Sequence, residues 1–167
     1  MKKKTWLIPV LAIACAGVIN FFFIINAHVP SASMEPTLNS GCFVIGNRLA
    51  YLSESPQLGD VVFFKKDDVS PSLLVKRIVA LPGMRFAMKD GKVYLNGEPI
   101  DEEYIDELGD SDYDEITVPD GCYLVLGDNR RESNDSRYWQ DPFVKQDQIK
   151  AKATLVWFPE FKNIYTE

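Results

Sequence analysis

A long uncharged, apolar stretch near the N-terminus places the strongest limit on how this chain can fold. Three lysines at positions 2–4 come first, and residues 5–30 then contain no Lys, Arg, Asp or Glu. A helix needs roughly 20 apolar residues to cross the hydrocarbon core of a bilayer. We therefore predict a transmembrane anchor over residues 6–28. Residues 1–5 should face the cytoplasm, because basic residues beside a span favour that side.

A cleaved secretory signal is the alternative interpretation of this stretch. Ala14-Cys15-Ala16 has small residues at the spacing of a cleavage site, and Ala14-Cys15 loosely resembles a lipoprotein box. The apolar residues continue from Gly17 to Ile25, however, whereas the core of a cleavable signal usually has about 7–15 residues. The length favours an uncleaved, single-pass anchor in the cell membrane. Residues 29–167 would then form an extracytoplasmic domain, which is the part to search for a catalytic site.

The rest of the chain reads as short strands separated by turn residues, without a long amphipathic helix. Asp90-Gly91 between residues 85–89 and 92–95 predicts a tight hairpin, because this dipeptide favours two-residue turns. We expect a mainly β, antiparallel domain in which residues of about 82–121 form a small inserted lobe. Further strands are expected at residues 42–46, 61–64, 73–80, 122–126 and 150–157.

The charge distribution is acidic, with a net charge of −6 and much of the acid in residues 101–103 and 106–115. Such runs are usually solvated surface segments, which is what we expect here. The acidic balance argues against a nucleic-acid partner, since such proteins present basic faces. Cys42 and Cys122 fall in the exported part, where a disulfide is permitted. A bridge and two small buried thiols both remain open.

Ser33 is the candidate nucleophile, and the chain offers almost no imidazole to activate it. The single histidine, His28, lies beside the apolar stretch and is a poor base for that reason. A serine hydrolase needs a base to take the hydroxyl proton, so a lysine is the expected partner. Lys65 and Lys66 are followed directly by acidic residues that should keep them charged. Lys76 is the leading candidate.

Lys76 lies in the middle of the apolar strand predicted at residues 73–80. A surface lysine whose stem covers apolar area is the structural alternative. If Lys76 is buried, desolvation disfavours its ammonium form. Action as a base near neutral pH requires its pKa to fall by roughly three units from about 10.4.

Two further hydroxyl groups are placed to assist such a pair. Ser31 is two residues before Ser33, where its hydroxyl could donate to an oxyanion beside the backbone N–H of Ser33. Ser133 lies in the polar turn at residues 127–137 and could orient the lysine amine. Two aspartates and two arginines of the same turn could pair bidentately and fix its shape.

The order of these segments resembles the type I signal peptidase family, in its small bacterial form with one N-terminal span. Four motifs carry the resemblance over nearly the whole chain: Ser33-Met34-Glu35-Pro36-Thr37-Leu38, Leu58-Gly59-Asp60-Val61-Val62, residues 75–83 and residues 127–137. The resemblance implies a mainly antiparallel β fold with a variable inserted lobe. It also implies a serine endopeptidase that removes signal peptides from exported preproteins and cuts after a small residue.

Carried over by position, the resemblance makes Ser33 the nucleophile and Lys76 the general base of a Ser–Lys dyad. Ser31 matches the side-chain oxyanion donor, and Ser133 matches the hydroxyl that orients the lysine. The supporting salt-bridge residues match Asp128, Asp135 and Arg137, and the pocket for small side chains matches Met34, Leu38 and Val75.

The partners implied by the resemblance are signal peptides and the lipid bilayer, with no cofactor, metal or nucleic acid. Two rival readings use the same residues differently. A self-cleaving repressor-type Ser–Lys protease would need a DNA-binding helical domain and no span. An anchored β-domain that binds a partner without catalysis would leave the serine and the lysine incidental.

Overall fold

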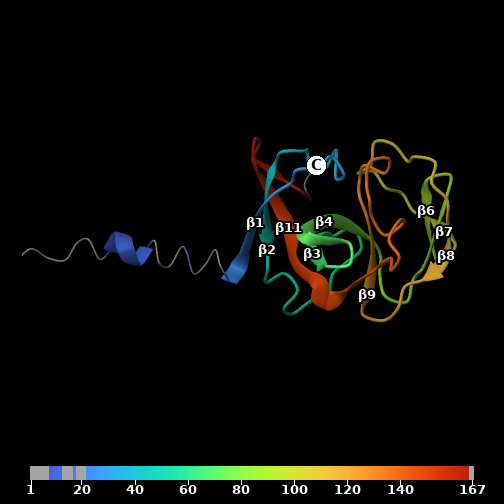
Figure 1. The fold of residues 1–167 in the computed structure, drawn as a ribbon, viewed down its shortest axis with the longest axis horizontal. Helices are drawn as coiled ribbons and strands as arrows, with labels where there is room; N and C mark the ends of the chain where they lie inside the picture. Colours follow the sequence, from blue (N-terminus) through green and yellow to red (C-terminus); the bar gives the residue numbers. More distant parts are fainter. Residues whose placement is uncertain (1–7, 13–16, 18–21, 166–167) are drawn as a thin grey trace, which may run out of the picture.

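The protein folds into two antiparallel β-sheets placed end to end (Figure 1). The structure, a computed structural model, describes residues 8–12, 17 and 22–165. The larger sheet has the strand order β1-β2-β11-β3-β4-β9-β10, with β12 beside β11, and the second has the order β7-β6-β5-β8. The predicted mainly antiparallel β fold is thereby confirmed.

The strands of the larger sheet come from both ends of the described chain. They are β1 (Ile24–His28), β2 (Phe43–Asn47), β3 (Val61–Lys66), β4 (Ser70–Ala80), β9 (Cys122–Leu126), β10 (Phe143–Lys145), β11 (Ile149–Phe158) and β12 (Lys162–Asn163). A single 3₁₀ turn, η1 (Gln146–Gln148), joins β10 to β11. The second sheet consists of β5 (Arg85–Lys89), β6 (Lys92–Leu95), β7 (Glu98–Pro99) and β8 (Tyr113–Thr117).

The second sheet lies within the residues predicted as an inserted lobe, about 82–121. Its β5–β6 hairpin turns at Asp90 and Gly91, with φ angles of 49° and 75°, and pairs Lys89 with Lys92. Positive φ at both central residues matches the twist of the flanking strands, which is why Asp-Gly marked this turn. The predicted hairpin is confirmed.

The N-terminal segment differs from the predicted anchor over residues 6–28. Ile24–His28 form β1 and pair along their whole length with β2, so the sheet begins inside the apolar stretch. The backbone groups of β1 are satisfied by β2, and Ile25 is buried in the core. Within residues 8–12, 17 and 22–165, no helix has both the length and the apolar character to span a bilayer. The predicted cytoplasmic residues 1–5 and most of residues 6–21 lie outside the described residues.

Three apolar clusters form the core, and one of them joins the two sheets. One joins Val79, Ala80 and Leu126 of the larger sheet to Phe86 and Val93 of the second, which fixes the lobe to the domain. Another lies around Val62, Phe64 and Ile78. The third packs β1, β2, β3 and β11 around the segment after β1. Each fully buried Leu, Val or Phe stabilises the fold by about 1.5–3 kcal/mol.

Candidate active site

Ser33 and Lys76 are brought into direct contact by the larger sheet. Ser33 lies in the connection between β1 and β2, and Lys76 lies within β4. Lys76 Nζ is 2.5 Å from Ser33 Oγ, within hydrogen-bonding distance. The two residues are only 7% and 5% exposed. A hydroxyl and an amine in contact, shielded from bulk water, are the groups required for nucleophile activation.

The Ser33 segment is held in place on both sides of the hydroxyl. Leu38 N donates to Met34 O at 2.8 Å, which closes a tight turn after the serine. The side chains of Met34 and Leu38 are fully buried and anchor that turn in the core. Asn129 N donates to Ser33 O at 3.2 Å from the neighbouring loop. Ser33 is therefore fixed by packing below it and by a backbone hydrogen bond beside it.

The surroundings of Lys76 lower the pKa of its amine from 10.5 to about 8. Burial is the largest cause, because a desolvated ammonium is less stable than a neutral amine. Asp135 and Asp128 act in the opposite direction, and Arg137 adds to the lowering. Near neutral pH a minor fraction of the amine is therefore neutral and able to accept a proton.

Ser31, the predicted oxyanion donor, lies beside the same hydroxyl. Its Oγ is 3.3 Å from Ser33 Oγ, and either oxygen can be the donor. Ser31 is exposed whereas Ser33 is buried. The two hydroxyl groups therefore lie between the solvent and the buried amine of Lys76. The oxyanion role of Ser31 stays a prediction.

The three residues predicted to line a substrate pocket belong to one apolar cluster. Met34 and Leu38 have no exposed surface, and Val75 is half-buried against them. Only Val75 of the three therefore presents surface to solvent. The pocket assigned to Met34 and Leu38 stays a prediction.

Two bidentate ion pairs support the loop at residues 127–137. Arg137 Nε and Nη2 donate to Asp135 at 2.8 and 2.9 Å, and both side chains are buried. Arg77 Nε and Nη2 donate to Asp128 at 2.9 and 2.7 Å. The pairing of Asp128 differs from the prediction, because its arginine comes from β4 and not from the loop itself. Arg77 directly follows Lys76 in β4, so the ion pair links the strand that carries Lys76 to the loop.

Ser133, the predicted orienting hydroxyl, is buried but does not bond to the amine. Ser133 Oγ has no hydrogen-bond partner among the described residues. The residue packs instead against Gly127, where an added Cβ would collide with Ser133 Oγ and with the carbonyl oxygen of Ser33. No hydrogen bond joins Ser133 Oγ to Lys76 among the described residues, and the orienting role of Ser133 stays a prediction.

Residues that the sequence analysis did not single out complete the surroundings of the dyad. Arg77 also donates to Gly59 O and to Thr37 Oγ1. Glu102, expected in a solvated acidic run, is buried and paired with Arg130. An arginine inside an apolar strand was the available signal for Arg77. Glu102 offered no local signal, because its partner lies far along the chain.

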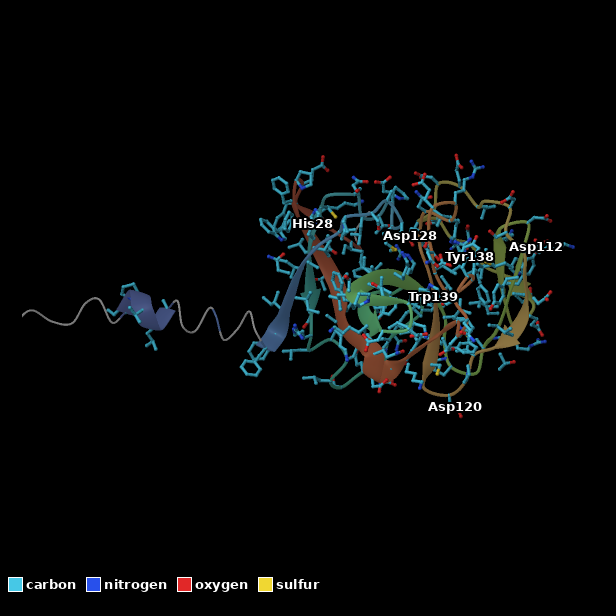
Figure 2. The ribbon with its side chains drawn as sticks, viewed as in Figure 1. His28, Asp112, Asp120, Asp128, Tyr138 and Trp139 are labelled. Carbon is cyan, nitrogen blue, oxygen red and sulfur yellow. The ribbon has the colours of Figure 1, made fainter. Side chains whose placement is uncertain are left out.

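His28 and the cysteines take no part in this site. His28 is exposed at the end of β1, with its ring centroid 5.0 Å from that of Phe43. Figure 2 shows it on the β1 side of the domain, across the molecule from Asp112 of the inserted lobe. In the described part of the chain, Cys42 and Cys122 are free thiols in separate apolar clusters. No group of three or more His, Cys, Asp or Glu side chains suited to a metal lies within these residues.

Comparison with known proteins gives matches over most of the chain. Residues 3–158 match the family described as "Signal peptidase, peptidase S26". The chain is 36% identical to "Probable signal peptidase I-2" of Synechocystis sp. over 166 residues, covering 94% of this chain and 75% of the relative. It is also 36% identical to "Signal peptidase I" of Bacillus caldolyticus, covering 95% of this chain and 91% of the relative.

A solved structure resembles the domain as well. The crystal structure of a signal peptidase I from Enterococcus faecalis V583 is 32% identical and superimposes with a TM-score of 0.53. The match covers 60% of this chain and 98% of that one. The similarity therefore extends from sequence to fold.

Proposed function

This chain belongs to the signal peptidase family, peptidase S26, and we propose that Ser33 and Lys76 form the catalytic dyad with which it removes signal peptides from exported preproteins. Family membership makes the protein a serine peptidase. The observation that carries the dyad is the buried contact of 2.5 Å between Lys76 Nζ and Ser33 Oγ.

The proposed reaction is acyl transfer. Neutral Lys76 takes the hydroxyl proton as Ser33 Oγ attacks the carbonyl carbon of the scissile bond. The Ser33 N–H and the Ser31 hydroxyl donate to the oxyanion that forms. The protonated lysine then gives its proton to the leaving amine. Water attacks the acyl-enzyme with the lysine again acting as base, which frees the signal peptide and restores Ser33.

We further propose that cleavage follows a small residue and that the enzyme works at the membrane. The first point rests on the family match of Met34, Leu38 and Val75, of which Val75 lies at the surface of the cluster. The second rests on the three lysines and the uncharged stretch that precede β1. Basic residues before an apolar stretch favour a cytoplasmic N-terminus, which leaves the β-domain extracytoplasmic. A shared bilayer would raise the effective concentration of anchored preproteins at the dyad.

Replacement of the two dyad residues tests the proposal. Ser33→Ala removes the nucleophile and Lys76→Ala removes the base, so each should lower the rate of preprotein processing by at least roughly 10³-fold. Ser53→Ala and Lys65→Ala make the same changes at exposed positions and should process at the parental rate. Gel separation of precursor and mature protein measures each rate. Parental activity in either dyad variant would refute the assignment.

His28→Ala separates this chemistry from an imidazole mechanism. Because His28 is exposed and packs on Phe43, its loss should leave the processing rate unchanged. Loss of activity in that variant would favour histidine as the base. Processing of a separate preprotein, rather than of the enzyme itself, would exclude the self-cleaving alternative.

A further inference from the structure

Two side chains of the inserted lobe reach onto two buried arginines next to the dyad. Glu102 and Tyr104 lie in the connection between β7 and β8. Arg130 Nη1 and Nη2 donate to Glu102 Oε2 and Oε1 at 3.0 and 2.5 Å. The guanidinium of Arg77 lies 3.9 Å from the centroid of the Tyr104 ring. Tyr104 itself donates to Glu102 Oε1, so the two lobe residues act as one unit.

Both arginines hold the loop that contacts the nucleophile. Arg130 Nε donates to Gly127 O at 3.1 Å, and Arg77 binds the carboxylate of Asp128. The next residue, Asn129, donates its backbone N–H to Ser33 O. Three consecutive loop residues are thus held, and the third binds the nucleophile's own peptide.

The contacts of the lobe are buried, which separates them from ordinary surface ion pairs. Glu102 is 6% exposed and Arg130 is 2% exposed. A buried bidentate pair has a fixed geometry, whereas an exposed pair contributes little. Loss of one partner leaves the other charge desolvated and unpaired, so the surrounding loop must rearrange. Burial of Tyr104 and the nearby Glu102 raise the pKa of its hydroxyl, which keeps it a proton donor to the carboxylate.

We propose that Glu102 and Tyr104 are positioning residues for peptide cleavage, because they clamp the loop at residues 127–130 and Arg77 against the Ser33–Lys76 pair. The inference rests on the proposed dyad. The lobe is then part of the catalytic apparatus, although among the described residues no hydrogen bond joins a side chain of the lobe to Ser33 or Lys76.

The clamp should govern both the rate and the protonation of the base. The charged groups that influence Lys76 are Asp128 and Asp135, which raise its pKa, and Arg137, which lowers it. Burial is the largest influence and, together with Arg137, outweighs the two aspartates. A released loop admits water, and hydration of the ammonium moves the pKa of Lys76 back towards 10.5. The same release misplaces Ser33, which slows the reaction without removing the surface that binds the substrate.

Graded replacements in the full-length, detergent-solubilised chain test this inference. Tyr104→Ala removes both the ring on Arg77 and the bond to Glu102, whereas Tyr104→Phe keeps the ring. Glu102→Gln keeps the shape of the carboxylate and removes its charge. Glu103→Gln is the matched control, because it makes the same change at the exposed neighbouring residue. The readouts are kcat, KM, the pH dependence of kcat/KM and the circular dichroism spectrum.

We expect Tyr104→Ala and Glu102→Gln to lower kcat by roughly 10- to 100-fold with little change in KM. The acid limb of kcat/KM should move to higher pH by about 0.5 unit or more. Tyr104→Phe should recover most of kcat, and Glu103→Gln should match the parent throughout. These results would support a positioning role.

Two outcomes overturn the inference. One is parental kcat and an unmoved acid limb in folded Tyr104→Ala and Glu102→Gln. The other is a loss of activity in proportion to the loss of folded protein, with the acid limb of kcat/KM unmoved. That result would indicate a purely structural role. Ser33→Ala is assayed in parallel. If it stays active, the dyad fails and the clamp fails with it. If it is inactive while the clamp variants behave as the parent, the clamp alone fails.

Discussion

The proposed reaction and the stability of the fold place opposite demands on Lys76. The proposed reaction needs a neutral amine, and burial of the side chain next to Ser33 favours that form. The lowering of its pKa from 10.5 to about 8 corresponds to a destabilisation of the folded state by about 3 kcal/mol at pH values below 8. This is a substantial part of the stability of a domain, which is commonly about 5–15 kcal/mol. The proposed base is therefore obtained at the expense of stability.

Proteolytic activity should rise with pH through the pKa of Lys76. The amine is protonated and inactive below this pKa and neutral above it, so kcat/KM should increase with an apparent pKa of about 8. Initial rates of preprotein cleavage between about pH 6 and pH 10 would measure the profile. An optimum on the acidic side would be inconsistent with an amine base.

Replacement of Lys76 by an apolar residue of similar length should stabilise the fold. At pH 7 the parent must bury an ammonium or give up its proton, whereas Lys76→Met does neither. The free energy of unfolding should rise by about 1–3 kcal/mol while activity is lost. The gain should shrink as pH rises from 8 towards 10.5, because the folded parent is then neutral while its unfolded chain still binds the proton. Urea unfolding at several pH values measures both effects, and equal stability at every pH would contradict them.

At the scale of elements, the features predicted correctly from the sequence are those that depend on neighbouring residues along the chain. The apolar strand at residues 122–126 and the Asp90-Gly91 hairpin lie as expected, because continuous apolar residues and turn chemistry act over short distances. Ser33 and Lys76 were found by chemistry, since the chain has one histidine and that residue lies elsewhere. By contrast, β1 looked like part of a span, because isoleucines suit lipid and a sheet core equally well. The burial of Glu102 could not be predicted from its neighbours in the sequence either, because it depends on an ion pair with the distant Arg130.

The ion pair between Asp135 and Arg137 should be the strongest single support of the loop at residues 127–137. Asp135→Asn leaves the buried guanidinium without its counter-charge, so the free energy of unfolding should fall by about 3–5 kcal/mol. Glu115→Gln breaks the exposed pair with Arg85 and should change it by less than about 1 kcal/mol. Denaturant titration of the two variants gives the comparison, and similar losses in both would show that burial does not set the strength of the pair.

On the scale of the whole molecule, the described fold begins close to where the apolar stretch ends. Every described strand lies at or after Ile24, and the first of them covers the edge of β2. Ile25 is buried in the same cluster as Met34 and Leu38, so β1 belongs to the domain that carries Ser33. Fold and proposed anchor therefore meet at this strand.

Two shortened chains should separate folding from membrane attachment. A chain of residues 22–167 keeps β1, so its free energy of unfolding should lie within about 0.5 kcal/mol of that of the full chain. A chain of residues 29–167 loses the strand and the burial of Ile25, so it should be less stable by at least about 2 kcal/mol. Flotation with lipid vesicles should recover the full chain and leave the 22–167 chain behind. Equal stability of the two shortened chains would show that β1 is dispensable.

The position of β11 has a consequence for the order in which the enzyme is made. This strand lies between β2 and β3. Among the described strands, it alone hydrogen-bonds both the half of the sheet formed by β1 and β2, whose connection carries Ser33, and the half that contains Lys76. It also follows both β2 and β4 in the sequence. A nascent chain should therefore contain Ser33 and Lys76 before it contains the strand that holds their two halves of the sheet in register, so we expect the contact between them to form only after β11 has been synthesised.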